Sequence, residues 1–251
     1  MNIFSFDTVR TDFWSCLRYL PETIKLSVVS ALIGIILGLL IAVIQMKKIK
    51  VLNQVCVVYN SFMRGTPILV QLYITYYGIP ILLKYINYYY GTSYNIEGID
   101  KVFFAILALG LNTAAFNSVT IRAALEAVDK GQIEAAQSIG MTNMQILFRI
   151  TIPEALEVAI PTLGNSFIGL IKGTSLAFTC AVVEVTAQAK ILAGRNYRYF
   201  EAYIAIAAIY WITTLVLELI LYLIKKKIHI KDVISDTDRK KMEICEAGES
   251  V

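Results

Sequence analysis

Long apolar runs alternate with shorter polar segments along this chain, and the alternation predicts helices that cross a membrane. A helix rises about 1.5 Å per residue, so a run of about 20 residues reaches across a hydrocarbon core of about 30 Å. We therefore expect an all-α, polytopic integral membrane protein whose spans form one domain over residues 23–224. The expected transmembrane helices, about five in number, are residues 23–46, 67–83, 102–121, 159–183 and 202–224.

The segments outside these runs differ from them in composition. Residues 1–22 mix charges with aromatic side chains, which fits a short interfacial helix outside the hydrocarbon core or a solvated arm. Residues 225–251 alternate acids and bases and predict a solvated tail. Between the second and third runs, a tyrosine cluster predicts an aromatic belt at the membrane surface or a docking surface for another protein. The cluster consists of Tyr85, Tyr88, Tyr89 and Tyr90.

The overall composition strengthens the membrane prediction and argues against several kinds of chemistry. The chain is 57% hydrophobic and 17% charged, with a mean hydropathy of +0.63, whereas soluble domains carry about 25% charged residues. His229 is the only histidine, and the four cysteines show no paired spacing. We therefore expect no catalytic residue and no metal site. The positive charge sits beside the spans, so we expect no nucleic-acid partner.

The lysines and arginines between the runs predict how the chain is oriented. Basic residues follow the first, third and fifth runs, and the cytoplasmic loops of membrane proteins carry an excess of such residues. We therefore expect a multi-pass protein of the bacterial cell membrane, with the N-terminus outside and the C-terminus in the cytoplasm. The residues that carry this bias are Lys47, Lys48, Lys50, Arg122, Lys130, Arg149, Lys225, Lys226 and Lys227.

The loop between the third and fourth runs, residues 129–153, has the clearest local signals. Asp129 and Thr142 are good N-caps, and each is followed three positions later by a glutamine, as in a capping box. Gly140 is a C-terminal stop, and Pro153 ends the unit or starts the next span. The loop is thus expected to form two short helices. Docking into a partner's groove and a simple turn on the membrane surface both remain open.

This loop resembles the EAA loop of ATP-binding-cassette import permeases. The family pattern is E-A-A-x3-G-x9-I-x-L-P, and the only departure is Ile152 in place of leucine. The resemblance implies a type I importer fold in which the loop forms a cytoplasmic coupling helix that contacts a separate ATPase subunit. The positions carried over to that contact are Glu134, Ala135, Ala136, Gly140, Ile150 and Pro153.

Two further segments resemble the polar amino-acid permeases of this group. Residues 62–72 match their FRGTP-xLVQL stretch, and residues 164–176 match N-x4-L-x-K-[DG]-T-S-L. The first match implies a gating or structural role for a short turn that starts the second span. That turn consists of Arg64, Gly65, Thr66 and Pro67. The resemblance covers roughly residues 15–225, and the KGTSLAF form of the second match is similar to cystine permeases.

Polar side chains inside the predicted spans mark a candidate path for a solute, because such groups usually face a cavity or a partner. Gly169 and Gly173 beside Lys172 would let the fourth span loosen and free backbone groups. Alternatively, the lysine snorkels and the asparagines only bond to neighbouring helices. Relatives that carry cationic amino acids often have aspartate at position 173, so arginine and lysine are less expected. The candidates are Asn112, Asn117, Asn165, Lys172, Thr174 and Ser175.

Together these features predict a permease subunit of an ATP-driven, binding-protein-dependent importer of polar amino acids, with L-cystine or a related sulfur amino acid favoured. The chain lacks G-x4-G-K-[ST], so it binds no cofactor and a partner ATPase uses the ATP and Mg. The expected partners are that ATPase, an extracytoplasmic solute-binding protein, the lipid bilayer and a second permease copy, as a homodimer or a homologous heterodimer. The alternative is an ATP-independent secondary transporter or channel for amino acids.

Overall fold

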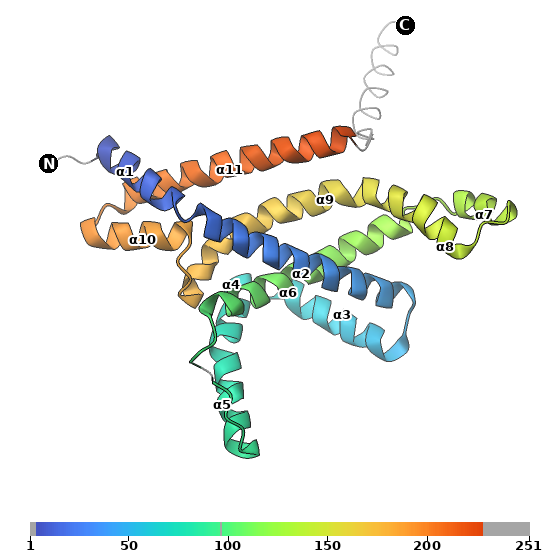
Figure 1. The fold of residues 1–251 in the computed structure, drawn as a ribbon, viewed down its shortest axis with the longest axis horizontal. Helices are drawn as coiled ribbons and strands as arrows, with labels where there is room; N and C mark the ends of the chain where they lie inside the picture. Colours follow the sequence, from blue (N-terminus) through green and yellow to red (C-terminus); the bar gives the residue numbers. More distant parts are fainter. Residues whose placement is uncertain (1–3, 96, 228–251) are drawn as a thin grey trace, which may run out of the picture.

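The computed structural model describes residues 4–95 and 97–227, and every regular element within them is helical. They form an elongated bundle, in which α7 and α8 lie at one end and α1 and α10 at the other (Figure 1). We call these the α7 end and the α10 end. The elements are α1 (Phe6–Leu17), α2 (Leu20–Met46), α3 (Lys50–Gly65), α4 (Ile68–Tyr73), η1 (Ile74–Gly78), α5 (Ile79–Tyr90), α6 (Lys101–Glu126), α7 (Lys130–Ser138), α8 (Asn143–Ile146), η2 (Leu147–Thr151), α9 (Ile152–Gly173), η3 (Thr174–Cys180), α10 (Val185–Asn196) and α11 (Tyr199–Lys227).

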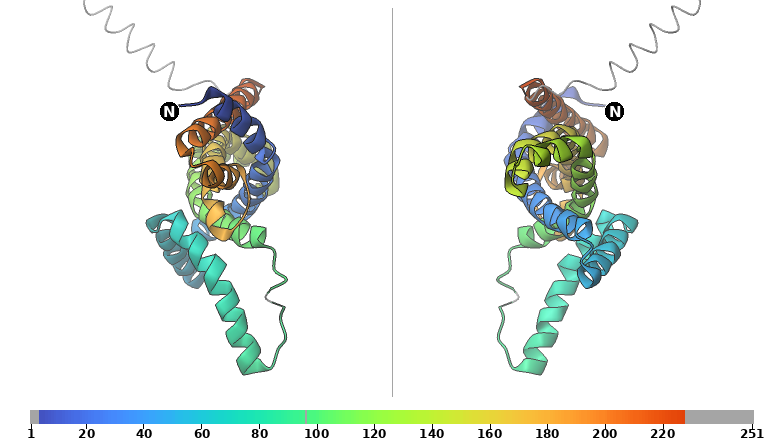
Figure 2. Two further views of the ribbon diagram at one scale, coloured as in Figure 1. Left: turned by 90° about the vertical axis from the view of Figure 1, so that its left-hand side faces the viewer. Right: turned by 90° about the vertical axis from the view of Figure 1, so that its right-hand side faces the viewer.

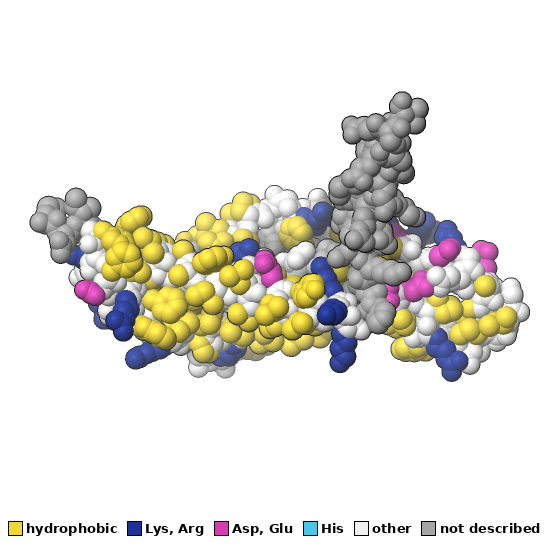
Figure 3. Space-filling model, turned by 90° about the horizontal axis from the view of Figure 1, so that it is seen from above, with side chains coloured by type: hydrophobic (Ala, Val, Ile, Leu, Met, Phe, Trp, Pro, Cys, Tyr) yellow, Lys and Arg dark blue, Asp and Glu magenta, His cyan; other side chains and the backbone are white. Residues whose placement is uncertain are grey.

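The prediction of an all-α protein with about five membrane spans is confirmed. Four helical stretches are long and apolar enough to cross a membrane, and a fifth is added if Asn143–Cys180 and Val185–Asn196 form one bent span. Apolar side chains cover much of the left half of the face in Figure 3, and most of the charged side chains lie at its left end and from the middle to the right. Residues 228–251, most of the expected tail, lie outside the described residues.

The fourth span departs most from the expected range of residues 159–183. It begins earlier, at Ile152, and its α-helix ends at Gly173. A 3-10 helix follows, in which the Thr174 hydroxyl donates to the carbonyl of Ile171, and Ala181 then adopts a left-handed φ of 57°. The helices Asn143–Cys180 and Val185–Asn196, on either side of this turn, are bent by 52° relative to each other. The α-helix therefore gives way to a tighter 3-10 helix directly after Gly173, and the predicted release of backbone groups stays a prediction.

The tightest packing in the bundle joins α2 and α6, which run parallel. Ser30, Gly34, Gly38 and Ala42 are all buried and recur every fourth residue on one face of α2. A Cβ atom at Gly34 would lie 2.7 Å from the Cγ2 atom of Thr113, so only glycine allows this approach. Small residues of this kind let membrane helices approach backbone to backbone. This pair forms the frame on which the remaining helices pack.

The second crossing differs from the expected span at residues 67–83. From Asn60 to Thr75 the chain runs antiparallel to α6, because Asn60 bonds Ser118 while the Thr75 hydroxyl donates to Phe104 near the opposite end of α6. Arg64 is exposed and lies part-way along α6, with its guanidinium carbon 5.6 Å from the ring centre of Phe116. From Ile79 onward, α5 leaves the bundle and runs crosswise to it (Figures 1 and 2). Hydropathy predicts the apolar length of this stretch, but it does not predict that the chain turns crosswise at Ile79.

Residues 6–17 form the helix α1, which packs with α10 and α11 at the α10 end. Their shared core consists of Cys16, Val185, Ala189, Ala193, Ala202, Ile206 and Ile209. Glu184 caps α10: it is fully buried, its carboxylate accepts from the backbone of Thr186 and Ala187, and it accepts from the Tyr210 hydroxyl at 3.0 Å. Of the two alternatives for the N-terminal segment, a helix and a solvated arm, the structure contains the helix.

Candidate coupling and translocation site

The spacing between Ala136 and Gly140 in the loop has a backbone explanation. The amide of Met141 donates to the carbonyl of Ala136 at 3.1 Å, and the amide of Gly140 donates to the carbonyl of Gln137 at 2.9 Å. These two bonds make a Schellman motif, in which the residue after the helix cap is left-handed and is usually glycine. Gly140 has a φ of 82° and fills that position. The helix α7 therefore ends in a defined hairpin tip.

The two faces of α7 have different environments. Glu134 and Ala135 are exposed, and Gly140 is exposed beyond them. Ala136 is only 4% exposed, and Ile133 packs against the cluster that α6 and α9 form at their α7 ends. The side chain of Ala136 thus faces the helical bundle and is not part of the exposed tip. Of the predicted contact residues on α7, Glu134 and Ala135 are the ones on the outer face.

The second half of the loop is one continuous helix with α9. Thr142 and Gln145 form a reciprocal capping box that starts α8, at 2.8 and 3.3 Å. A π-helical turn, η2, follows without a break and leads into α9, where exposed Pro153 occupies the first turn. Ile150 is half-buried within this turn. Proline has no amide hydrogen to donate to a carbonyl in the preceding turn, and the π-helical turn η2 lies at that point.

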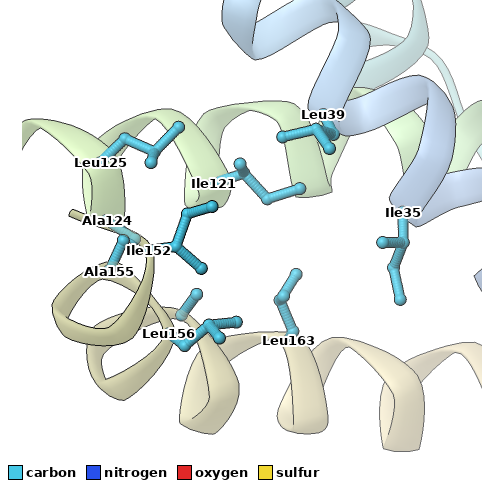
Figure 4. Close-up of a pocket in the computed structure, with 10 residues that line it drawn as sticks. Ile35, Leu39, Ile121, Ala124, Leu125, Ile152, Ala155, Leu156 and Leu163 are labelled. Carbon is cyan, nitrogen blue, oxygen red and sulfur yellow. The ribbon is translucent and has the colours of Figure 1, made fainter. Parts of the chain in front are cut away.

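Ile152 holds the continuous helix of α8, η2 and α9 against α2 and α6. It lines an apolar cleft of about 240 Å³ between α2, α6 and α9. Figure 4 shows Ile152 and Leu156 of α9 facing Ile121 of α6. The aliphatic residue of the I-x-L-P pattern is thus an anchor, and isoleucine serves as well as leucine in an aliphatic cleft. The start of α9 is therefore packed against α2 and α6.

The predicted turn of residues 64–67 is a break between α3 and α4, and Gln71 holds it. The Gln71 side chain is 3% exposed and donates to the carbonyls of Met63 and Thr66 and to the Thr66 hydroxyl. Its carbonyl oxygen accepts from Asn112 at 3.0 Å. The network fastens the break to α6. Gly65 and Pro67 are exposed, and a Cβ at Gly65 would meet no atom within 4 Å.

A cavity of about 250 Å³, lined mostly by apolar side chains and by a few polar groups, lies between α4, α6 and α9. Asn112, Thr113 and Ser166 supply its polar groups, and Gly169 and Gly173 leave it open on the side of α9. Arg64 makes no ion pair within the described residues and lies over the ring of Phe116, which also lines the cavity. The cavity thus combines amide and hydroxyl groups with a nearby free cation.

The other predicted path residues lie around this cavity in different environments. Asn117 is buried and accepts from the Ser166 hydroxyl at 3.0 Å. Asn165 and Lys172 are exposed on α9 and do not line the cavity. Thr174 is buried and satisfied within its own turn, and Ser175 is half-buried. Asn112 is therefore the one predicted path residue that reaches the cavity directly.

Comparison with known proteins gives the family. Residues 34–230 match the family described as binding-protein-dependent transport system inner membrane component. The chain belongs to this family. We refer to it below as the permease.

The relatives of the permease are similar over most of its length. It is 41% identical over 216 residues to the probable amino-acid permease protein YxeN of Bacillus subtilis, which covers 86% of the permease and 92% of YxeN. It is 38% identical over 210 residues to the L-cystine transport system permease protein TcyL of the same organism, over 84% and 85% of the two chains. It also matches the crystal structure of an amino acid ABC transporter with histidines, at 34% identity and a TM-score of 0.75, covering 89% of the permease and 99% of that chain.

These findings confirm that the permease has the type I importer fold and is a membrane-embedded transport subunit, not an enzyme. The energy source is a separate ATPase of the general kind that serves this family, and the alternative of an ATP-independent transporter is not favoured. Multiple spans place the permease in the inner membrane.

The structure also reveals residues that the motif search did not single out. Ile139 follows α7, Met144 lies in α8 and Phe148 lies in η2, and they are 80%, 62% and 61% exposed. Exposed apolar side chains gathered in this way mark protein interfaces. Gln71 was likewise missed as a site residue, although a glutamine in an apolar run is itself a signal of a buried polar contact.

Proposed function

We propose that the permease imports a polar amino acid and that its loop of residues 129–153 transmits the closure of the partner ATPase to α9. The observation that carries this proposal is the unbroken helical path from Asn143 to Gly173. One end of that path lies beside the exposed tip, and the other end lines the cavity between α4, α6 and α9. A rigid element that touches both sites can couple them, because a shift at one end moves the other.

The contact with the ATPase would combine a charge with an apolar surface. Glu134 and Ala135 present the outer face of α7, and Ile139, Met144 and Phe148 supply apolar area next to it. Closing of an ATPase dimer would draw two such tips together and rock the spans toward the outward-facing state. Release of the hydrolysis products would restore the inward-facing state. In this scheme the α7 end lies in the cytoplasm, the N-terminus lies outside and the C-terminus inside.

The cavity suits the charged groups of an amino acid. The Asn112 amide nitrogen is engaged by Met63 and Gln71, whereas its oxygen accepts no hydrogen bond from the described residues. That oxygen would accept from an ammonium group, and the free guanidinium of Arg64 would attract a carboxylate. We infer a zwitterionic substrate. The similarity to an L-cystine permease favours cystine or a related sulfur amino acid.

A second copy of the permease, or a homologous subunit, would complete the path. Thr162, Asn165 and Lys172 form an exposed polar stripe on α9. Lipid is a poor environment for such side chains, so they are expected to face a water-filled path or a partner. A path lined by α9 from two permease chains satisfies this requirement. A solute-binding protein would deliver the amino acid at the α10 end.

The proposal is tested by Glu134→Ala in the full transporter, with Glu97→Ala as the matched control. Both carboxylates are exposed, but Glu97 lies in the segment between α5 and α6, which Figure 1 shows well away from α7. We expect Glu134→Ala to weaken ATPase binding and to lower amino-acid uptake per ATP hydrolysed, and Glu97→Ala to leave both unchanged. Unchanged binding and coupling in Glu134→Ala would contradict the proposal. Competition for uptake among cystine, glutamine, glutamate and arginine then identifies the substrate.

A further inference from the structure

A hairpin at the α10 end has almost no contact with the rest of the permease. We call it the crosswise arm. It consists of α5 (Ile79–Tyr90) and the return leg, residues 91–95 and 97–100. None of the residues of α5 is buried. Figure 2 shows the arm projecting sideways from the bundle, with α5 and the return leg as its two sides.

Both ends of the arm are fixed at the start of α6. Just before the arm, the Thr75 hydroxyl donates to the carbonyl of Phe104, and the rings of Tyr76 and Phe104 lie 5.8 Å apart, edge to face. Just after the arm, Asp100 caps α6 by accepting from the amide of Val102 at 3.0 Å. The arm therefore leaves the bundle at the level where α6 begins and runs across the direction of the spans (Figure 1).

The return leg limits how deep the arm lies. It is irregular, and its exposed residues include Ser93, Asn95, Glu97 and Asp100. Irregular backbone facing lipid does not occur in the hydrocarbon core, because its amides and carbonyls would have no partners. The return leg must therefore lie at the depth of the headgroups or beyond them in water.

Asn87 joins the C-terminal end of α5 to the start of the return leg. Its side-chain nitrogen donates to the carbonyl of Tyr94 at 3.0 Å, and its oxygen accepts from the Thr92 hydroxyl and the Tyr94 amide at 2.9 and 3.0 Å. Three hydrogen bonds from one residue hold the two sides together beside Gly91, which turns the chain with a φ of 64°. The helix and the return leg are thus one flat unit.

The surface of α5 fits the headgroup layer better than water. Apart from Lys84 and Asn87, its side chains are aliphatic or tyrosine, and it has no acid. Tyr85, Tyr88, Tyr89 and Tyr90 are 55%, 82%, 62% and 77% exposed. Tyrosine is enriched where membranes meet water, since its ring is apolar and its hydroxyl is polar. In water the same helix would expose a large apolar patch.

We propose that the crosswise arm lies flat in the headgroup layer of the leaflet at the α10 end, with its tyrosines against lipid and its return leg toward water. The partner of this surface is the phospholipid itself. The arm would fix the depth and tilt of the neighbouring start of α6. This inference does not depend on which solute the permease carries or on how the loop couples to the ATPase.

The test uses tryptophan emission in the permease–ATPase complex, reconstituted in phosphatidylcholine vesicles. Tyr88→Trp places a reporter on α5, and Tyr197→Trp is the matched control, because Tyr197 is 84% exposed in the turn between α10 and α11 at the extreme of the α10 end. The emission of Trp14 and Trp211 is subtracted with the parent complex. Each complex is compared in lipids brominated near the carbonyl end and near the methyl end of the acyl chains.

We expect the emission added by Tyr88→Trp to lose most of its intensity in lipid brominated near the carbonyl, and less in lipid brominated near the methyl end. The emission added by Tyr197→Trp should lose little in either. Equal emission of Tyr88→Trp in brominated and plain lipid would overturn the proposal, since water, a second permease copy or a binding protein would then cover the arm. Stronger quenching near the methyl end would also overturn it, because the arm would then lie in the hydrocarbon core.

Discussion

Gly140 offers the sharpest mutational test of the loop. Substitution to alanine adds one methyl group at a left-handed position, where φ is 82°. The new Cβ would meet no atom within 4 Å, so crowding contributes nothing and the effect comes from the backbone alone. A left-handed conformation costs about 1–2 kcal/mol for a residue with a Cβ atom. The exposed permease loop can relieve this strain by opening the last turn of α7, and binding of the ATPase must then close it again.

Gly140→Ala should therefore weaken binding of the purified ATPase by about 5- to 30-fold, which corresponds to about 1–2 kcal/mol. Gly140→Asn should weaken it less, because asparagine tolerates the left-handed region. Gly194→Ala is the control: Gly194 lies within α10, has no positive φ, and its Cβ would also meet nothing within 4 Å. A binding titration in detergent measures all three. Equal affinity for the parent and Gly140→Ala, or equal weakening in Gly194→Ala, would refute the reasoning.

Three further predictions concern stability. Gly34→Val should lower the thermal unfolding temperature because a Cβ there lies 2.7 Å from Thr113, whereas Gly169→Ala, which meets nothing within 4 Å, should unfold like the parent. Gln71→Leu should lower the free energy of unfolding by about 1–3 kcal/mol, measured with denaturant, because it leaves buried polar groups unpaired; unchanged stability would contradict the network. Burial and the neighbouring Glu201 carboxylate raise the pKa of Asp12 above its ordinary value of 3.8. Between these two pKa values the folded state binds more protons than the unfolded state, so the free energy of unfolding falls as pH rises from 3.8 through the raised pKa. Asp12→Asn should abolish that decline in thermal unfolding scans, and a retained decline would assign it to other groups.

The local features of the loop followed from the sequence because they depend on short-range geometry. A threonine followed three residues later by a glutamine gave the capping box at Thr142, which the structure contains. The similar pair at Asp129 forms only half of that pattern: Asp129 accepts from the amide of Gly131, and no bond from Gln132 returns. Gly140 was recognised as a stop because left-handed backbone strongly favours glycine. The inward face of Ala136 depends on where α6 and α9 lie, which a local pattern does not contain.

The directions of the helices and the lining of the cavity were harder to predict, because a local sequence pattern does not say where other helices lie. Hydropathy measures the apolar length of a run, and it predicted one span over residues 67–83 although the chain turns crosswise at Ile79. Similarly, the cavity depends on how α4, α6 and α9 meet, and only Asn112 among the predicted path residues reaches it. The polar character of these positions was visible in the sequence. Their facing direction was set by the small-residue contact between α2 and α6, on which the other helices pack.

The most direct test of the central claim is amino-acid uptake into vesicles that contain the permease, its ATPase and the solute-binding protein. The ATPase is compared with a variant that binds ATP without hydrolysing it. If the permease is one part of an ATP-driven gate, uptake against a gradient stops with the inactive ATPase, and Glu134→Ala lowers uptake with the active one. Uptake that continues at the parent rate with the inactive ATPase would contradict the account and would identify an ATP-independent transporter or channel.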